Sequence, residues 1–470
     1  MNTSIKYFTP LLLSLSMAGC MVGPDYSAPK PPEEQHYLAD PQQEALLNNG
    51  QALREDWWAL LDSPDLNLTV ERALAQNGSL VIARANLAKA REGVAMAAGG
   101  RLPQVDAGAS MDRTKVGATS FGPQAVDFPI FSAYGAGFSV TYDLDLFGGE
   151  QRQVEMATAN AQVEQQALNA VHLEVSGNAV SVSLRMAVVS GQIKAVTSVI
   201  DADQHILEMV QRAVSAGAAA PMDVTLAQSQ LDRDRARLPS LNQALEVNRG
   251  TLTTLVGSTE TRWTAPDFDL EKLQLPANIP VVVPSELVRL RPDIRAAEAR
   301  LQAANAWVGV TTSDLYPHLN LSANLSDEAL FSGPANSAWS LIGGLAGPVF
   351  HGGTLSARKR AAEDAYQATL AAYQQTVLRA FQQVSVSMHG LQNAADEVRA
   401  QKQALDSANT ALRLTQQAYW VGSAGVVQVM QTQRTQQLAK VQLVQAVGKQ
   451  YLETVNLFLA MGGGTLNRVL

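Results

Sequence analysis

Residues 318–326 read HLNLSANLS, and every second side chain is apolar. Strict alternation places apolar and polar side chains on opposite faces of a β-strand. Residues 134–144, YGAGFSVTYDL, alternate in the same way, and residues 104–112 and 339–347 do so more weakly. Each stretch has about the 9–11 residues of a tilted strand in a transmembrane barrel. A sheet half-buried on a soluble core gives the same alternation, so both interpretations stay open at this point.

The composition is poor in charge for a chain of this length. Charged residues make up 17% of the 470 residues, against about 25% in soluble domains, and the mean hydropathy is −0.03. Beyond the N-terminal segment no run reaches the roughly 20 apolar residues of a membrane-spanning helix. The net charge of −8 argues against a nucleic-acid partner, which needs clustered positive charge. The chain must therefore cover its apolar surface by association of strands and helices.

The chain contains one unit twice. Residues 80–103, LVIARANLAKAREGVAMAAGGRLP, align with residues 294–317, IRAAEARLQAANAWVGVTTSDLYP. The alignment pairs Leu80 with Ile294, Leu87 with Leu301, Pro103 with Pro317, Gly217 with Gly422, Val224 with Val429, Gln228 with Gln433 and Gly257 with Gly462. So long a period indicates pseudo-symmetry rather than a solenoid. We therefore predict repeats at 63–257 and 285–462, a turn-rich linker at 258–284, an N-terminal segment at 20–62 and a tail at 463–470.

Long helices are predicted near 150–213, 222–256, 354–419 and 425–461. Apolar residues recur every seven positions in the third of these helices, at Leu370, Val377, Val384, Leu391, Val398, Leu405, Leu412 and Tyr419. The first helix repeats in the same way through Leu168, Val175, Val182, Val189 and Val196. A strict seven-residue period indicates a left-handed coiled-coil seam. Pro239 is expected to kink the second helix.

The number of strands predicts an oligomer. Strands are expected near 104–115, 133–145, 318–327 and 337–348, which is four for each chain. Four strands cannot close a barrel, and a bilayer excludes open sheet edges. About eight strands form the smallest barrels, which side chains fill, so an open lumen needs more. Three chains would supply twelve strands, with pseudo-six-fold symmetry from the internal repeat.

The N-terminal segment ends in LSMAGC, residues 15–20, which contains the only cysteine of the chain. A basic residue, a short apolar run and small residues before Cys20 resemble a bacterial lipoprotein signal at 1–19, which implies that Cys20 is acylated. An ordinary signal peptide with an incidental cysteine is the alternative. Met21 follows in place of Asp, which in the resembled class favours delivery to the outer membrane. The proline-rich PDYSAPKPPEE that follows is expected to form an extended tether.

Three further motifs carry a family resemblance: YDLDLFGG at 142–149, RPDIRAAEARLQAANAWVGV at 291–310 and PVFHGG at 348–353. The chain resembles the TolC-type outer-membrane efflux proteins, in their lipoprotein branch (OprM-like and NodT-like). The resemblance implies an α+β membrane channel-tunnel, a homotrimer with a 12-stranded β-barrel, a long α-helical barrel of coiled-coil helices and a mixed equatorial domain. The termini and the linker would form the equatorial domain.

The resemblance also implies a function and its partners. Such proteins are passive exit ducts of tripartite efflux pumps in the outer membrane of Gram-negative bacteria, extending into the periplasm. The expected partners are two further copies of the chain, a periplasmic membrane-fusion adaptor, an inner-membrane transporter of the RND type and outer-membrane lipid. No cofactor is expected beyond the covalent lipid on Cys20. The alternative is an exit duct for type I protein secretion or another structural conduit that spans the periplasm.

The two turns between the long helices carry the residues expected to meet the adaptor. By resemblance these are Gly217 and Ala218 in the first turn and Gly422 and Ser423 in the second. A glycine at these positions also suits a left-handed turn, so a purely structural role stays open.

A pore constriction is expected just beyond the turns, because relatives place one or two Asp residues after the second turn. This chain has Gln428 and Gln431 there, and Asp223 is the only acidic residue near either turn. Asp223 could equally serve to start its helix. We therefore expect no strong acidic gate.

Residues for catalysis are not apparent. The histidines, His36, His172, His205, His318, His351 and His389, are scattered, and no pair has metal-ligand spacing. The G-x-S-x-G, G-x-x-x-x-G-K and H-E-x-x-H motifs do not occur in the sequence. We therefore expect neither a catalytic residue nor a metal ligand, and a channel rather than an enzyme.

Overall fold

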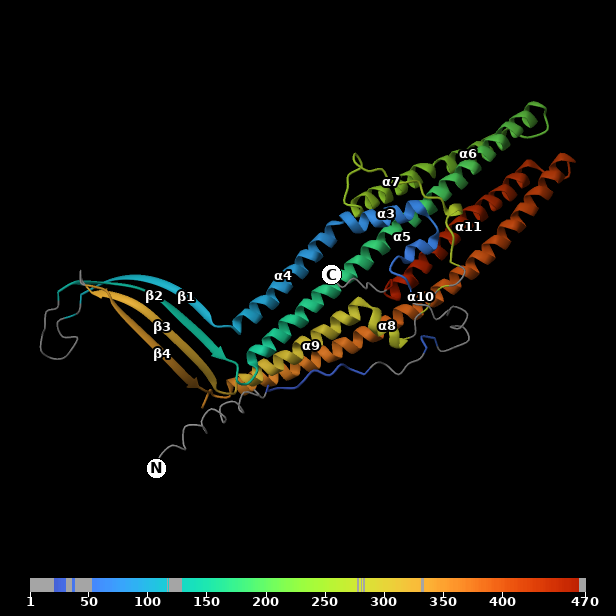
Figure 1. Cartoon of the computed structure of the whole chain (residues 1–470). Coiled ribbons are helices and arrows are strands. Elements are labelled where there is room, and N and C mark those ends of the chain that lie inside the picture. The colour runs from blue at the N-terminus through green and yellow to red at the C-terminus, as the bar shows by residue number, and fades with distance from the viewer. Residues whose placement is uncertain are drawn as a thin grey trace. The chain divides into compact units, whose positions relative to one another are not determined.

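A computed structural model describes residues 21–30, 36–38, 53–115, 117, 129–276, 279, 281, 284–330 and 334–464. Figure 1 shows long helices and one small sheet. The first repeat contributes α3 (Pro64–Gln76), α4 (Gly78–Gly100), β1 (Gln104–Thr114), β2 (Phe131–Leu144), α5 (Gly149–Ser215), α6 (Pro221–Arg235) and α7 (Leu238–Leu255). The second contributes α8 (Pro284–Leu290), α9 (Pro292–Ser313), β3 (His318–Leu330), β4 (Asn336–Ala346), α10 (Thr354–Trp420) and α11 (Val426–Ala460). Two 3₁₀ turns, η1 (Trp57–Leu61) and η2 (Leu270–Lys272), flank the first repeat.

The sequence places the return helix of the first repeat near 222–256, with a kink at Pro239. The structure breaks this segment into α6 and α7 at Ala236 and Arg237, one residue before the proline, and α7 starts at Leu238. A proline lacks the N–H for an intrahelical bond, and its ring clashes with the carbonyl four residues earlier. Pro239 therefore fits only in the first turn of a new helix, where it lies in α7.

The two halves of the chain share one antiparallel sheet with the order β1-β2-β3-β4. Its central pair joins β2 of the first repeat to β3 of the second, with Ala136 opposite Asp327. The outer pairs place Gly108 opposite Gly137 and Ala323 opposite Leu341. In the described chain β1 and β4 are therefore sheet edges whose outer backbone groups no strand of the same chain pairs. The predicted count of four strands is confirmed.

Large apolar side chains of this sheet are exposed. Trp339 is 80% exposed and Leu341 73%. The other large apolar side chains of the strands that are at least about half exposed are Val105, Met111, Tyr134, Phe138, Leu325, Ile342 and Leu345. An exposed apolar patch of this size on a sheet marks an interface with protein or membrane.

The chain divides into two compact units. One unit holds the sheet, residues 21–29 of the N-terminal segment, the beginnings of α5 and α10 and most of α9. The other holds the remaining parts of the long helices with η1, α3, α6, α7, α8 and α11. The core of this second unit is built around Trp57, which is fully buried and packs on Phe458 with ring centroids 5.6 Å apart.

The residues of the seven-residue tracks are buried or half-buried, as a coiled-coil seam requires. Val182 and Val384 are 4% and 0% exposed. The other buried members are Val175, Val196, Val377, Leu391 and Val398. Among the described helices, α5 alone has a window apolar and long enough to cross a membrane, and half of that window is buried within the chain. Burial in the seam accounts for its apolar composition.

The paired glycines of the two repeats have the same backbone conformation. Gly217 and Gly422 have φ of +73° and +77°, and Gly257 and Gly462 have φ of +65° and +89°. These are left-handed conformations that favour glycine over other residues, because glycine has no Cβ. The predicted duplication therefore extends to the backbone of the turns.

A glycine inside a helix sets the distance between α5 and α11. A Cβ built on Gly448 of α11 collides with both methyl groups of Val188 on α5. We predict that Gly448→Ala destabilises the protein by about 1–3 kcal/mol, because overpacking forces these helices apart. The double substitution Val188→Ala with Gly448→Ala should recover most of this loss.

The stability of each variant is measured as the temperature at which the purified protein unfolds. Gly250→Ala in α7 is the control, because its Cβ would meet only a Glu260 oxygen at 3.8 Å, and alanine favours a helix by about 1 kcal/mol over glycine. A Gly448→Ala protein as stable as the control would show that α5 and α11 are not closely packed here.

Candidate functional site

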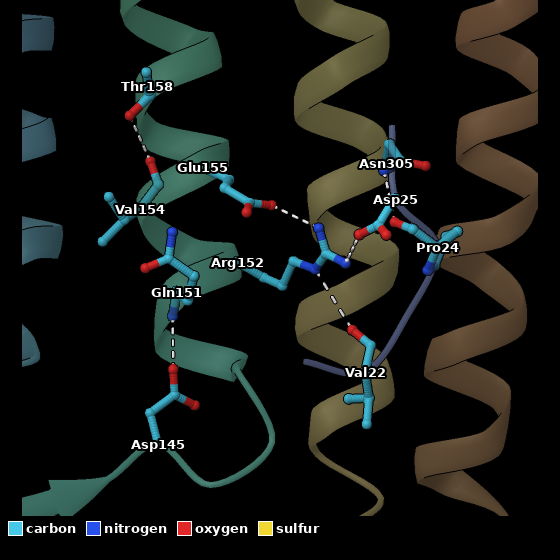
Figure 2. Close-up of polar contacts among 10 residues, drawn as sticks. All are labelled: Val22, Pro24, Asp25, Asp145, Gln151, Arg152, Val154, Glu155, Thr158 and Asn305. Carbon is cyan, nitrogen blue, oxygen red and sulfur yellow. Dashed lines mark hydrogen bonds and ion pairs between the residues drawn. The ribbon is translucent and has the colours of Figure 1, made fainter. Parts of the chain in front are cut away.

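The segment after Cys20 is bound along the strand–helix junction of the sheet-containing unit. The Val22 N–H donates to the Phe147 carbonyl over 3.0 Å, where β2 leads into α5. The Asn305 Nδ2 on α9 donates to the Pro24 carbonyl over 2.9 Å. Figure 2 shows the segment running along α9, with the Arg152 side chain of α5 reaching across α9 to it. Backbone groups of the segment are therefore satisfied by two different elements of the sheet-containing unit.

Arg152 of α5 is the charged centre of this contact. Its side chain is 3% exposed, and its guanidinium pairs with Asp25 of the segment and Glu155 of α5, both at 2.8 Å. The Arg152 Nε also donates to the Val22 carbonyl at 3.5 Å (Figure 2). Burial lowers the pKa of Arg152, but the hydrogen bonds and charges of Glu155 and Asp25 outweigh burial and leave that pKa raised. A buried arginine with two carboxylate partners holds the segment in one register.

Glycines allow the segment to approach this closely. Gly23 has φ of +92°, and a Cβ built on it would lie 2.6 Å from the Gly309 Cα. A Cβ on Gly309 would lie 2.7 Å from the Arg152 Cγ, and one on Gly148 would lie 2.5 Å from the Met21 Cγ. Met21 thus lies against the turn between β2 and α5. Cys20 and the predicted signal at 1–19 lie outside the described residues.

The α5–α6 and α10–α11 turns end the two helical hairpins of the other unit (Figure 1). The Ala218 N–H donates to the Ala213 carbonyl over 2.8 Å, and the Gly217 N–H donates to the Val214 carbonyl over 3.0 Å. The Ser423 and Gly422 N–H groups make the same two bonds to Ala418 and Tyr419. Both turns are therefore Schellman motifs, which explains the glycines by backbone conformation alone.

The first turns of α6 and α11 differ in their polar groups. The Asp223 carboxylate accepts the Ala220 N–H at 3.1 Å, so it caps α6. Gln428 and Gln431 are exposed on α11. A capping carboxylate stabilises a helix N-terminus. The structure therefore gives Asp223 the helix-start role that the sequence left open.

Apolar side chains are exposed near both turns. Trp420 and Val421 are 78% and 79% exposed, and Met222 at the start of α6 is 69% exposed. A cavity of about 450 Å³ lies between α5, α10 and α11, and its lining includes His205, Met209, Tyr419, Trp420 and Gln433. Large exposed apolar side chains on helix ends suit contact with another protein. Among the described residues no three His, Cys, Asp or Glu side chains are placed to hold a metal ion.

Comparison with known proteins fits this geometry. The model of the family described as outer membrane efflux protein matches residues 69–258 and 283–463. The chain belongs to the outer membrane efflux protein family. Two similar relatives are the pyoverdine export outer membrane protein OpmQ of Pseudomonas aeruginosa, 29% identical over 96% of both chains, and the toluene efflux pump outer membrane protein TtgC of Pseudomonas putida, 26% identical over 97% of this chain and 96% of the relative. The solved outer-membrane channel OprN superposes with a TM-score of 0.86 at 27% identity, covering 95% of this chain and 99% of OprN.

Family membership confirms the resemblance and the channel-tunnel fold predicted from the sequence. The matched ranges lie close to the predicted repeats at 63–257 and 285–462. The expected roles of Cys20, the turn residues and the two glutamines remain predictions. Arg152 was missed, because an arginine that follows LFGGEQ looks like an exposed residue of a helix start. In the sequence, the one residue that could have indicated the role of Arg152 is its partner Asp25, which follows Val-Gly-Pro and lies 127 residues away.

The contact between the segment and α5 generates a prediction. Arg152→Met should release residues 21–29, because hydrogen bonds to a charged group contribute about 1.5–3 kcal/mol each. We expect amide hydrogen exchange of Val22 to accelerate at least about tenfold, measured by mass spectrometry of the N-terminal peptide. Arg358→Met is the control, since Arg358 pairs with Asp314 in the same unit over 3.2 Å but is 55% exposed. Equal exchange in both variants would show that Arg152 does not hold the segment.

Proposed function

We propose that three copies of this family member close into a twelve-stranded barrel and form the outer-membrane exit duct of a tripartite efflux pump. One observation carries the proposal: the four-stranded sheet has exposed apolar side chains and two edges without a partner in the described chain. Lipid cannot satisfy backbone N–H and C=O groups, so such a sheet must close with other copies. Each copy adds four strands, and three copies exceed the roughly eight strands of a filled barrel.

The partners follow from the hairpin ends. Exposed Trp420, Val421 and Met222 around the two Schellman turns support docking of a periplasmic adaptor, with Gly217, Ala218, Gly422 and Ser423 at its centre. An inner-membrane transporter, of the RND type in this proposal, would supply the energy. The duct itself would conduct passively.

The proposed cargo is small molecules. OpmQ is named for pyoverdine export and TtgC for toluene efflux. Both relatives align over nearly the whole chain, so the duct of this protein would serve cargo of comparable size. Type I protein secretion, the alternative from the sequence, has no support among these relatives.

A lipid on Cys20 is the proposed membrane anchor. The bound segment brings Met21 to the turn after β2, where a membrane-spanning strand would leave the bilayer. Acyl chains on the preceding residue would then enter the leaflet beside that strand, each buried CH₂ contributing about 0.8 kcal/mol. Cys20→Ala should abolish incorporation of radiolabelled palmitate and reduce the trimer recovered from outer membranes. Unchanged labelling would contradict acylation at Cys20.

The resting tip is proposed to be closed by packing and glutamine hydrogen bonds rather than by a ring of charge. Asp223 is engaged in the cap of α6, and Gln428 and Gln431 carry no fixed charge. Three copies of each residue would surround the pore. Multivalent cations should therefore block this channel weakly, because a ring of carboxylates is absent from these two positions.

Single-channel conductance in planar bilayers tests the duct and the tip together. The purified trimer should insert and conduct, with modest cation preference and weak block by a trivalent cation added on the periplasmic side. Gln428→Asp with Gln431→Asp should sharpen that block by at least about tenfold in concentration, since six carboxylates would then face a narrow pore. Asp232→Asn, an exposed site on α6, is the control. Failure of the trimer to conduct would contradict the duct, whereas tight block of the unmodified channel would contradict only the uncharged tip.

A further inference from the structure

Two aspartates occupy core positions of the coiled-coil seam. Asp203 continues the seven-residue track of Val182, Val189 and Val196 on α5, and Asp234 follows Ala227 by seven residues on α6. Asp203 and Asp234 are each 5% exposed. Their neighbours in the core of these helices are apolar, namely Val196, Ile200, Ile206, Leu207, Val210, Ala227, Leu231 and Val441. Carboxylates are rarely buried to this extent unless they are paired or protonated.

The partners of the two carboxyl groups come from α11, from α6 and from the break between α6 and α7. The Asp203 Oδ1 accepts the Gln437 Nε2 of α11 at 3.3 Å. Asp234 accepts the Gln230 amide one turn earlier on α6 and pairs with the Arg237 guanidinium at 3.4 Å. The Asp203 Oδ2 and the Gln433 Nε2, both buried, have no hydrogen-bond partner. One oxygen of the pair therefore lacks a donor in a core that excludes solvent.

A shared proton supplies the missing donor. The Asp203 and Asp234 carboxyl groups lie within hydrogen-bonding reach of each other. Two ionised carboxylates can only accept hydrogen bonds, so at this separation they would repel each other and leave an acceptor unsatisfied. If one is protonated, its O–H donates to the other, and a single negative charge remains for Arg237. We propose that Asp203 and Asp234 form a proton-binding site that clasps α5 and α6 to α11 above the hairpin tips.

The electrostatics of the site agree with this geometry. Burial, and then hydrogen bonding and repulsion by Asp234, raise the pKa of Asp203 from 3.8 to about 6, while the hydrogen bond from Gln437 acts in the opposite direction. Arg237 contacts Asp234 rather than Asp203, so the proton belongs on Asp203. Asp234 also lies in the last turn of α6, where the helix dipole disfavours a second negative charge.

The other charged groups around the pair lie at the surface. On α5, Asp201 and His205 are exposed, and on α6 the exposed Arg235 donates to Gln204 of α5 at 3.1 Å. On α11 the residues facing the pair, Gln433 and Gln437, are uncharged, while Arg434 is exposed and Lys440 half-buried. Among the described residues, Arg237 is thus the one charge that contacts either carboxyl group directly.

The direction of the pH effect follows from the raised pKa. In the packed form Asp203 keeps its proton up to about pH 6. In an opened or unfolded form, where its pKa is near 3.8, Asp203 loses the proton at lower pH. Packing is therefore strongest below about pH 4, weakens as the pH rises toward about 6 and is constant above that value. The whole change corresponds to on the order of a hundredfold in the equilibrium constant for opening. If the chain forms the proposed duct, its tip would therefore open more easily at neutral than at acidic pH.

Hydrogen exchange on the full-length trimer in lipid nanodiscs tests the site without depending on conduction. Peptides covering residues 227–237 and 430–441 are followed between pH 4.5 and 7.5, and the intrinsic pH dependence of amide exchange is divided out. The wild-type protein should lose protection by about 20–30-fold across this range, since part of the full change lies below pH 4.5. Asp203→Asn should remove this dependence, because its amide donates to Asp234 at every pH. Asp234→Asn should also remove the pH dependence, because its amide donates to Asp203. This second variant replaces Asp203→Asn in the test if Asp203→Asn fails to assemble.

Asp232→Asn is the matched control, two residues from Asp234 but exposed, and it should keep the wild-type dependence. Wild-type protection that is independent of pH, or a pH dependence that survives in the Asp203→Asn or Asp234→Asn trimer, would overturn the proton-binding site. Conductance recorded on the same variants separates the two proposals. A pH-dependent clasp without channel activity would contradict the duct and leave the proton site standing.

Discussion

The structure depends on one constraint: backbone polar groups cannot be left without hydrogen bonds in lipid. The four strands satisfy one another within the sheet, but the outer sides of β1 and β4 find no strand of the same chain. A soluble protein would cover such edges with charged residues, a bulge or a helix. Here the faces beside them carry Trp339, Leu341 and Met111 exposed. The proposed closure with other copies would satisfy these edges.

The helices meet the same requirement in a different way. A continuous helix satisfies its own backbone, so α5 and α10 need only bury a seam, which the seven-residue tracks provide. At the ends of the hairpins, glycine satisfies the last carbonyls in Schellman motifs. Where α6 ends before Pro239, a carboxyl pair replaces apolar side chains in the seam. The apolar seam is thus interrupted by a buried polar pair close to the break between α6 and α7.

Much of the fold could be predicted from the sequence because its signals are periodic. Alternation defined the strands, the seven-residue tracks defined the long helices, and Pro239 marked the break between α6 and α7. The bound N-terminal segment could not be predicted, since Arg152 and Asp25 are far apart in sequence and each looks like a surface residue. The track through Val196 continues to Asp203, but periodicity alone does not identify its partner on α6. The role of Asp223 in capping needed the position of the Ala220 N–H.

In the proposed barrel, β4 of one copy pairs with β1 of another, and site-specific photo-cross-linking can detect this pairing. A benzophenone amino acid at Leu341 of β4, in trimers mixed from ¹⁴N- and ¹⁵N-labelled chains, would be photolysed in outer membranes and mapped by mass spectrometry. We expect cross-linked peptides that join β4 to residues 104–114 of a differently labelled chain. The cross-linked products, separated by size, should extend to the trimer and no further. Links to β1 confined to one chain, or a ladder that ends at the dimer, would contradict it.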